Sequence, residues 1–289
     1  MNRKSIVNPT NSPDEVRSSL SSRLALLARA AIWRLRLFFN LRHLRFRGAY
    51  ATFKEAAAAV RRDALVGYDN DAVVLRDYDL MCEVKLEDYP VLFWLRHLAP
   101  QARVLLDAGG HMGTKYRAFR NHLELDGEIE WVVYDLPTIV RAGRQRAKDD
   151  GLNTLRFIDT LSEAPDADVL LASGLLQFLD IPFGDLLHRL PAMPRHLLLN
   201  KVQTREGPSV VTLENFIYAE VPYQIRDRAE FLAEMDRLGY DIVDEWTIPS
   251  LSHIIPTHPH LGSSISRGYY AKLRTSKRLK ANVVGVRMN

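Results

Sequence analysis

Between residues 99 and 273 the apolar positions follow two alternating patterns, short continuous runs and longer stretches with apolar residues three and four positions apart. Continuous runs of this length predict buried strands, and the wider spacing predicts helices that bury one face. The runs predict strands at 103–107, 130–135, 154–158, 168–172 and 196–202, and the spaced stretches predict helices at 113–125, 136–148 and 183–190. Strands and helices that alternate in this way indicate a parallel, doubly wound α/β sheet.

The pattern changes near the end of this region. An amphipathic helix is predicted at Arg228–Leu238, with Gly239 in the position that commonly ends a helix. Two further strands, 240–248 and 266–273, follow with no helical pattern between them. Strands joined in this way pair most easily as antiparallel neighbours. We therefore expect a Rossmann-like sheet whose final strand is antiparallel.

The first 98 residues follow no strand–helix alternation. Residues 46–50 are predicted as a turn, residues 52–62 as a helix with Thr52 and Glu55 forming a capping box, and residues 90–98 as a helix. The predicted organisation is a disordered leader at 1–15, an N-terminal helical extension at 16–98, a cofactor-binding domain at 99–273 and a basic tail at 274–289.

The charge of the chain is concentrated in the extension. Residues 1–62 carry 13 Lys and Arg against 3 Asp and Glu, whereas the whole chain has a net charge of only +4. The arginines of the basic helix predicted at 16–46 are spread around its surface, which favours packing on its own domain or a partner subunit over a membrane-surface role. Contact with an anionic surface and a transit-peptide-like role remain alternatives, and a homodimer is also open.

Other features of the composition exclude several classes of protein. The single cysteine, Cys82, excludes a disulfide framework and a cysteine-rich zinc site. No uncharged apolar run is long enough for a transmembrane helix, and no signal peptide is convincing. We expect a cytoplasmic or membrane-peripheral protein that acts on a small molecule and not on nucleic acid.

A glycine-rich loop, Val104–Gly113, joins the first strand of the sheet to its helix. A dinucleotide-binding pattern in this register would need glycine at position 108, where the chain has alanine. The S-adenosylmethionine pattern, an acid followed by three glycines at alternate positions, fits Asp107, Gly109 and Gly113 and departs only at His111. The loop therefore favours S-adenosylmethionine, with a nicotinamide cofactor as the alternative.

Ligands of doubly wound sheets bind at the carboxyl ends of the strands, which selects further candidate residues. Asp135 follows the second strand, where a carboxylate accepts hydrogen bonds from ribose hydroxyls; the alternative is a helix N-cap. The remaining cofactor candidates are Gly110, Asp159, Thr160 and Ser173, and the substrate candidates are Gln177, Asn200 and Tyr223.

Three histidines, His253, His258 and His260, occupy one proline-rich loop. Histidine is the natural general base near neutral pH, so His253 and His258 are candidates for deprotonating an acceptor, and His111 is the rival candidate. A zinc site is the weaker alternative because no acidic ligand is nearby, and we expect no metal. The chain has no serine-hydrolase elbow or P-loop, which disfavours acyl hydrolysis and phosphoryl transfer.

Taken in order, these segments resemble a family of bacterial class I S-adenosylmethionine-dependent methyltransferases of unassigned substrate, found among polysaccharide and secondary-metabolite genes. The resemblance covers residues 46–273 and is carried by Phe46–Tyr50, Gly67–Asp69, Leu106–Tyr116, Trp131–Pro137, Leu171–Phe178, Asn200–Gln203, Val221–Gln224 and Gly268–Ala271. Asp135 and Lys201 depart from it, standing where the family more often has glutamate and arginine.

The resemblance implies the class I methyltransferase fold and cofactor roles for Asp107, Gly109, Gly110, Gly113 and Asp135. It also implies in-line SN2 transfer of a methyl group to oxygen or nitrogen of a small polar acceptor, such as a sugar or secondary metabolite. A nicotinamide-dependent oxidoreductase and a non-catalytic Rossmann-like binding module are the competing hypotheses.

Overall fold

The computed structural model describes residues 44–61, 65–66, 78–123, 129–216 and 219–274. The chain divides into two units, Met1–Arg45 and Phe46–Asn289, and the second contains nearly all the described residues. The predicted leader, nearly all of the basic helix at 16–46 and the basic tail lie outside the described residues, apart from Arg274 at the start of the tail.

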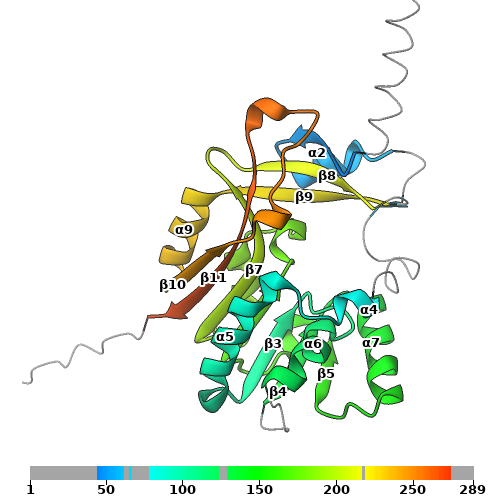
Figure 1. Cartoon of the computed structure of the whole chain (residues 1–289), viewed down its shortest axis with the longest axis vertical. Helices are drawn as coiled ribbons and strands as arrows, with labels where there is room; N and C mark the ends of the chain where they lie inside the picture. Colours follow the sequence, from blue (N-terminus) through cyan, green and yellow to red (C-terminus); the bar gives the residue numbers. More distant parts are fainter. Residues whose placement is uncertain (1–43, 62–64, 67–77, 124–128, 217–218, 275–289) are drawn as a thin grey trace, which may run out of the picture. The chain divides into compact units, whose positions relative to one another are not determined.

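The second unit is built on a central sheet, which follows the predicted alternation of strands and helices (Figure 1). Its strands are β3 (Val104–Ala108), β4 (Glu130–Tyr134), β5 (Leu155–Ile158), β6 (Val169–Ser173), β7 (His196–Arg205), β10 (Tyr240–Thr247) and β11 (Ile265–Leu273). Strands β5, β4, β3, β6 and β7 lie side by side and parallel, whereas β11 pairs antiparallel with both β7 and β10. The predicted fold class, a doubly wound Rossmann-like sheet with an antiparallel final strand, is confirmed.

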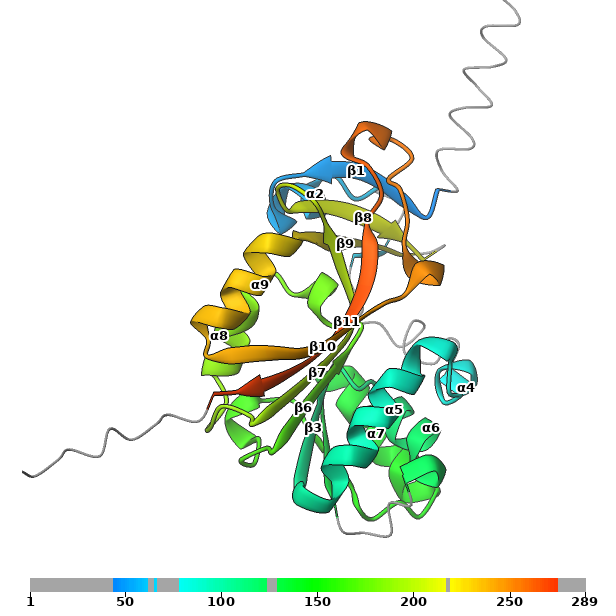
Figure 2. The same cartoon turned by 60° about the vertical axis from the view of Figure 1, so that its left-hand side comes forward.

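Helices cover both faces of this sheet (Figure 2). One layer consists of α5 (Tyr89–Leu98), α6 (Thr114–Leu123) and α7 (Pro137–Asp149), and the other of α8 (Phe183–His188) and α9 (Arg228–Arg237). Successive residues of a strand point to opposite faces, so Leu105 packs in the core under the first layer and Leu106 in the core under the second. Both faces are therefore buried, which explains the continuous apolar runs of the parallel strands.

A second group of strands adjoins the carboxyl end of β7. It contains β1 (Phe46–Tyr50), β8 (Val210–Asn215), β9 (Ala219–Asp227) and the short β2 (Leu65–Val66), with α2 (Phe53–Ala58) packed against them. Strand β9 pairs antiparallel with β8 and, at Arg226 and Asp227, parallel with the end of β7. The sequence patterns did not predict β8 and β9.

The prediction of a turn at residues 46–50 is wrong. This segment is β1, which pairs antiparallel with β8 from Phe46 to Tyr50. Gly48 adopts a positive φ of 74° and the register shifts beside it, so the strand contains the glycine irregularity that suggested a turn. Phe46 is buried, and the Arg47 side chain donates hydrogen bonds to the fully buried Glu220 of β9, which fixes the strand in place.

The capping box predicted at Thr52 is half confirmed. Thr52 Oγ1 accepts a hydrogen bond from the Glu55 N–H at 3.1 Å, but the Glu55 carboxylate accepts from the Ala51 N–H, and not from that of Thr52. Helix α2 also ends at Ala58, earlier than predicted.

No described helix is long and apolar enough to cross a membrane.

Candidate active site

Three alternate positions of the glycine loop have a left-handed backbone. Gly109, His111 and Gly113 all have left-handed φ values, of 71°, 54° and 76°. His111 therefore takes the glycine conformation in the position where the pattern has glycine, at a cost of about 1–2 kcal/mol for a residue with a Cβ. A Cβ on Gly113 would lie 2.6 Å from Leu155 Cδ2, so a larger residue here would also displace the end of the Leu155 side chain.

Asp135 joins this loop to the end of β4. Its Oδ2 accepts a hydrogen bond from the His111 N–H and its Oδ1 accepts one from the Leu136 N–H, both at 2.8 Å. Burial raises the pKa of the Asp135 carboxyl, while these two backbone donors lower it in part. The N-cap residue of α7 is Leu136, so the alternative role of Asp135 as a helix cap is wrong.

Asp107 lies beneath the loop and is 1% exposed. Its Oδ2 accepts a hydrogen bond from Trp131 Nε1 at 3.1 Å, and a Cβ on Gly110 would lie 2.6 Å from its Cγ. Because Gly110 has no Cβ, the backbone of the loop packs directly against the Asp107 carboxyl group. Burial raises the pKa of Asp107 to about 7, although Trp131 and Lys115 favour the charged form.

A buried charge pair next to the loop was not predicted. Lys115, in the first turn of α6, bonds Asp88 Oδ2 at 2.7 Å, and burial lowers the pKa of the Lys115 ammonium. Asp88 belongs to the short helix η1 (Leu86–Asp88), where Glu87 lies 3.5 Å from Lys201 Nζ. Lys201 interrupts the extended backbone of β7 with a φ of 63°. These residues are far apart in sequence and have no motif spacing, so no sequence pattern could group them.

The end of β6 presents two buried polar atoms without partners. Ser173 Oγ and Gln177 Oε1 make no hydrogen bond within the described residues. Gln177 lies in η4 (Leu176–Phe178), immediately after the Ser173–Gly174 turn. Buried polar atoms of this kind are rare, and a bound ligand is one explanation for them.

Asp159 and Thr160 follow β5, next to the end of β4. The Asp135 N–H donates to the Ile158 carbonyl at 3.3 Å, which brings the two strand ends together. Thr160 is exposed and its Oγ1 lies 3.3 Å from Asp159 Oδ1. Both side chains are therefore accessible at the edge where an adenine ring is predicted.

Three of the predicted residues gather around one aromatic cluster. The His253 ring stacks on Phe46 with centroids 3.7 Å apart and meets the edge of Tyr223 at 5.8 Å. Tyr223 in turn contacts Phe178, the neighbour of Gln177, at 5.4 Å. His253 Nδ1 lies 3.2 Å from Ser264 Oγ. The structure thus brings Gln177, Tyr223 and His253 to one region.

The other candidate substrate and base residues have different contact partners. Asn200 is 1% exposed; its Nδ2 donates to the Glu87 carbonyl and its Oδ1 accepts from Trp246 Nε1, both at 3.1 Å. His258 Nδ1 lies 2.9 Å from Thr257 Oγ1, and the exposed His260 is its neighbour. Among the described residues no group of three or more His, Cys, Asp and Glu is arranged to hold a metal ion.

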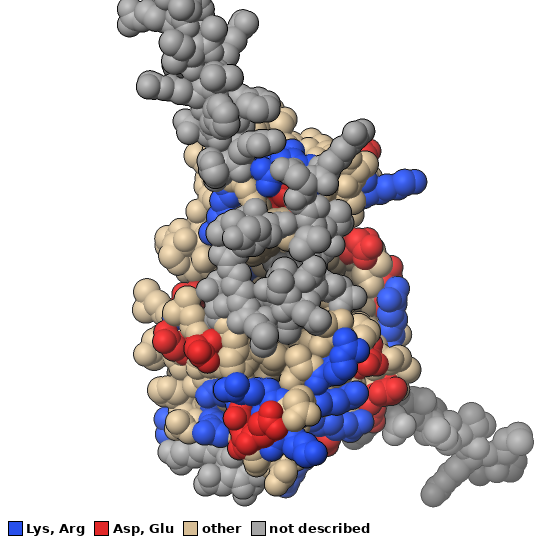
Figure 3. All heavy atoms as spheres, turned by 90° about the vertical axis from the view of Figure 1, so that its right-hand side faces the viewer, with Lys and Arg blue, Asp and Glu red and all other residues tan. Residues whose placement is uncertain are grey.

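The face that carries α6 and α7 shows Lys and Arg interspersed with Asp and Glu (Figure 3). Asp150, for example, forms ion pairs with both Arg117 and Arg146.

No protein-family model and no curated protein matches this chain. Among solved structures, the chain is similar to the N-terminal domain of EvdMO1 with SAH bound, at 12% identity and a TM-score of 0.46 over 66% of this chain and 83% of that one. It is also similar to 1,6-didemethyltoxoflavin-N1-methyltransferase of Burkholderia thailandensis, at 21% identity and a TM-score of 0.44 over 75% of this chain and 95% of that one. A third similar structure is human N-acetylserotonin methyltransferase in complex with SAM, at 15% identity and a TM-score of 0.45 over 72% of this chain and 58% of that one. Similarities this low carry no argument about the activity of this chain.

Proposed function

We propose that this chain is an S-adenosylmethionine-dependent methyltransferase acting on a small polar molecule. The observation that carries the proposal is the left-handed backbone at Gly109, His111 and Gly113, held by Asp135 at the end of the next strand. Three left-handed residues at alternate positions satisfy the S-adenosylmethionine pattern even where histidine replaces glycine.

The residues present fit this cofactor. Asp135 accepts one backbone hydrogen bond at each oxygen, and a carboxylate has about four acceptor positions, so it retains capacity for two ribose hydroxyls. Asp159 and Thr160 would border the adenine, and Ser173 Oγ is a buried polar atom that makes no hydrogen bond within the described residues. Gly109 and Gly110 would allow close approach of the backbone, and Asp107 would support the loop from beneath.

The bound cofactor would supply a methyl group on a positively charged sulfur. The chain's own residues would then align the acceptor with that methyl group and exclude water. Gln177 and Tyr223 would orient the acceptor at the end of β6, and His253 would accept its proton, with His258 and His111 as the other candidate bases. Asn200 would act through its bonds to Glu87 and Trp246, shaping the site from behind.

Calorimetric titration with S-adenosylhomocysteine and with NAD tests the cofactor. We expect S-adenosylhomocysteine to bind and NAD not to bind; binding of NAD alone would replace the proposal with the oxidoreductase. Turnover of labelled S-adenosylmethionine against sugars and secondary metabolites then tests catalysis. Cofactor binding with no methyl transfer to any acceptor would favour the non-catalytic module.

We further propose that the protein is cytoplasmic and forms a homodimer, with the basic N-terminal segment at a subunit or membrane surface. Support for a protein contact comes from large apolar side chains exposed along η1 and α5, of which Leu86 is 84%, Phe93 64% and Tyr89 57% exposed. Neighbouring exposed apolar groups of this size commonly mark interaction surfaces. Light scattering after gel filtration measures the oligomeric state.

A further inference from the structure

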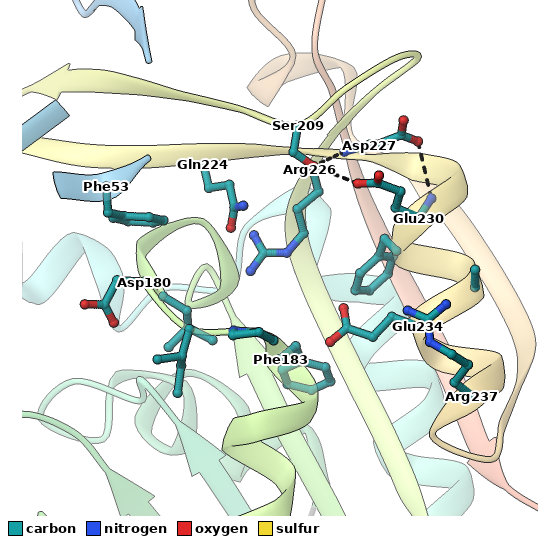
Figure 4. Close-up of a pocket in the computed structure, with 15 residues that line it drawn as sticks. Phe53, Asp180, Phe183, Ser209, Gln224, Arg226, Asp227, Glu230, Glu234 and Arg237 are labelled. Carbon is teal, nitrogen blue, oxygen red and sulfur yellow. Dashed lines mark hydrogen bonds between the residues drawn. The ribbon is translucent and has the colours of Figure 1, made fainter. Parts of the chain in front are cut away.

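Strand β9 sends alternate side chains to two different regions. Tyr223 and Ile225 belong to the aromatic cluster around His253, whereas Gln224 and Arg226 face the opposite way, since successive residues of a strand alternate. Figure 4 shows Gln224 and Arg226 directed into a cavity on that second side. The cavity is therefore separate from the glycine loop and from the aromatic cluster.

The cavity has a volume of about 570 Å³ and lies between β9, α9 and the segment that follows η4. Its apolar wall consists of Phe53, Leu179, Ile181, Pro182 and Phe183. The Arg226 guanidinium projects into the space between this wall and α9 (Figure 4). The volume is sufficient for a small molecule.

Arg226 is buried, at 7% exposure, yet its guanidinium makes no hydrogen bond or ion pair within the described residues. Its Nη1 is fully enclosed without a partner. Burial lowers the pKa of Arg226 to about 10, although the charge of the nearby Glu234 carboxylate favours the charged form, so the group remains charged at neutral pH. Charged groups buried for structural reasons are normally paired, because an unpaired buried charge opposes folding. A binding partner from outside the chain explains the exception.

Three of the four carboxylates that line the cavity form hydrogen bonds with other groups. Glu234 Oε1 accepts a hydrogen bond from the Gly184 N–H at 2.9 Å, and Asp227 Oδ1 accepts from the Ala229 N–H at 2.8 Å. Glu230 Oε2 lies 3.4 Å from Ser209 Oγ. These acids, with Asp180, nevertheless give the rim negative charge. The lining thus combines the buried Arg226 guanidinium, an apolar wall and a rim on which four carboxylates outnumber one further guanidinium, that of Arg237.

We propose that this cavity binds a small amino-acid-like zwitterion with an apolar side chain. Its carboxylate would accept the paired N–H groups of Arg226, a geometry that suits guanidinium and carboxylate. Its ammonium group would face the acidic rim, and its side chain would lie against the wall that includes Phe53 and Phe183. A phosphate is disfavoured because its second negative charge would meet a rim on which four carboxylates outnumber the single guanidinium of Arg237. The inference does not depend on the proposed methyl transfer.

Calorimetric titration of the full chain with L-phenylalanine tests the proposal directly. We expect saturable binding, and binding at least about tenfold weaker for 3-phenylpropionate, which lacks the amine, and for L-phenylalaninamide, which lacks the carboxylate. The absence of saturable binding of L-phenylalanine overturns the proposal, as does equal binding of either analogue. Saturating S-adenosylhomocysteine should leave the affinity unchanged; competition would mean that L-phenylalanine occupies the cofactor site, and would also overturn it.

The variant Arg226→Met separates a binding role from a structural one. Methionine retains much of the length of the side chain and removes the charge, so we expect L-phenylalanine affinity to fall at least about tenfold and the melting temperature not to fall. The control is Arg195→Met, because the Arg195 side chain is 74% exposed and does not line the cavity. This variant should change neither the L-phenylalanine affinity nor the melting temperature. A lower melting temperature with unchanged affinity would identify Arg226 as structural and overturn the proposal. Should Arg226→Met fail to fold, the analogue series on the unaltered protein decides alone.

Discussion

At the scale of single residues, His111 shows how a backbone conformation persists where the side chain opposes it. Its φ of 54° is retained because its N–H donates to Asp135 and the glycines on either side impose the same left-handed path. A residue with a Cβ in this conformation stores strain. Such strain is most often found at ligand sites, which fits the proposed cofactor loop.

Replacing His111 with glycine should therefore stabilise the protein. We expect a gain of up to about 1 kcal/mol, because relief of about 1–2 kcal/mol of left-handed strain is partly offset by the greater freedom of glycine in the unfolded chain. Urea denaturation measures the change, and His111→Ala, which keeps the Cβ, is the matched control. If both variants turn over normally, His111 is not the general base; if glycine destabilises more than alanine, the strain argument fails.

Asp135 should be the residue on which cofactor affinity depends most. In Asp135→Asn an amide NH₂ replaces one acceptor oxygen and the charge is lost, so we expect S-adenosylhomocysteine to bind about tenfold or more weakly. Asp166→Asn, an exposed position at the other end of the sheet, is the control. Calorimetry gives both affinities, and equal values for the two variants would exclude Asp135 from the cofactor site.

Asp107 should make stability depend on pH. Its folded pKa of about 7 lies above the ordinary value of 3.8, so between these values the folded state holds a proton that the unfolded state has released. The free energy of unfolding therefore falls as pH rises from about 4 to about 7, and the penalty is fully present above that range. We expect Asp107→Asn to be more stable than the parent above pH 7 and equal to it near pH 4. Urea denaturation at several pH values measures both proteins. A difference in their free energies of unfolding that stays constant between about pH 4 and about pH 7 would contradict the raised pKa of Asp107.

The proposed base is tested by His253→Gln and His258→Gln, which remove the titrating imidazole from two positions in the same loop. Loss of a general base typically lowers turnover by about 10²–10⁴-fold. We expect this loss for His253, which contacts Tyr223 and Phe46, and little change for His258. Near-normal turnover of both would mean that transfer relies on positioning alone.

At the scale of elements, β1 links the second group of strands to the candidate site. It is anchored by Arg47, whose guanidinium pairs with the fully buried Glu220 of β9, and it presents Phe46 to the His253 ring. Arg61 also lies 3.1 Å from the Glu220 carboxylate. The buried Glu220 carboxylate thus holds β1, at the start of the second unit, against the β8–β9 hairpin, which carries Tyr223.

Glu220→Gln should destabilise the protein markedly. It leaves two arginines without their buried counter-charge, and breaking a buried ion pair typically costs about 3–5 kcal/mol. Glu163→Gln, at an exposed side chain, should cost almost nothing. Urea denaturation compares the two variants, and a small, equal change in both would show that β1 is held by other contacts.

At the scale of the whole molecule, the chain divides next to Phe46, the first residue of β1. A chain lacking residues 1–45 therefore keeps every described strand and should still bind S-adenosylhomocysteine with normal affinity. We expect methyl transfer to persist and membrane or subunit association to be lost, because we propose that the N-terminal segment lies at a subunit or membrane surface. Loss of methyl transfer with normal cofactor binding would instead show that the segment takes part in the reaction, and loss of cofactor binding would show that it belongs to the cofactor domain.

The sequence alone determined the central sheet and the glycine loop. Runs such as Val104–Ala108 are apolar throughout because parallel strands are buried on both faces, and this signal is local. The loop was equally local, since the residues at 107, 109 and 113 constrain their own backbone. Asp135 could be selected because the carboxyl end of a strand is a position that the alternating pattern defines.

Only the tertiary structure decided where β1 forms and which distant side chains meet in the candidate site and the cavity. Strand β1 forms because Arg47 meets Glu220, which is 173 positions away, and short segments with mixed polar and apolar residues carry no local sign of such pairing. The same holds for Lys115 with Asp88, for His253 stacked on Phe46 and for Arg226 enclosed in its cavity. Burial and pairing of a polar side chain depend on which distant elements pack around it, and the spacing of residues along one segment does not contain that information.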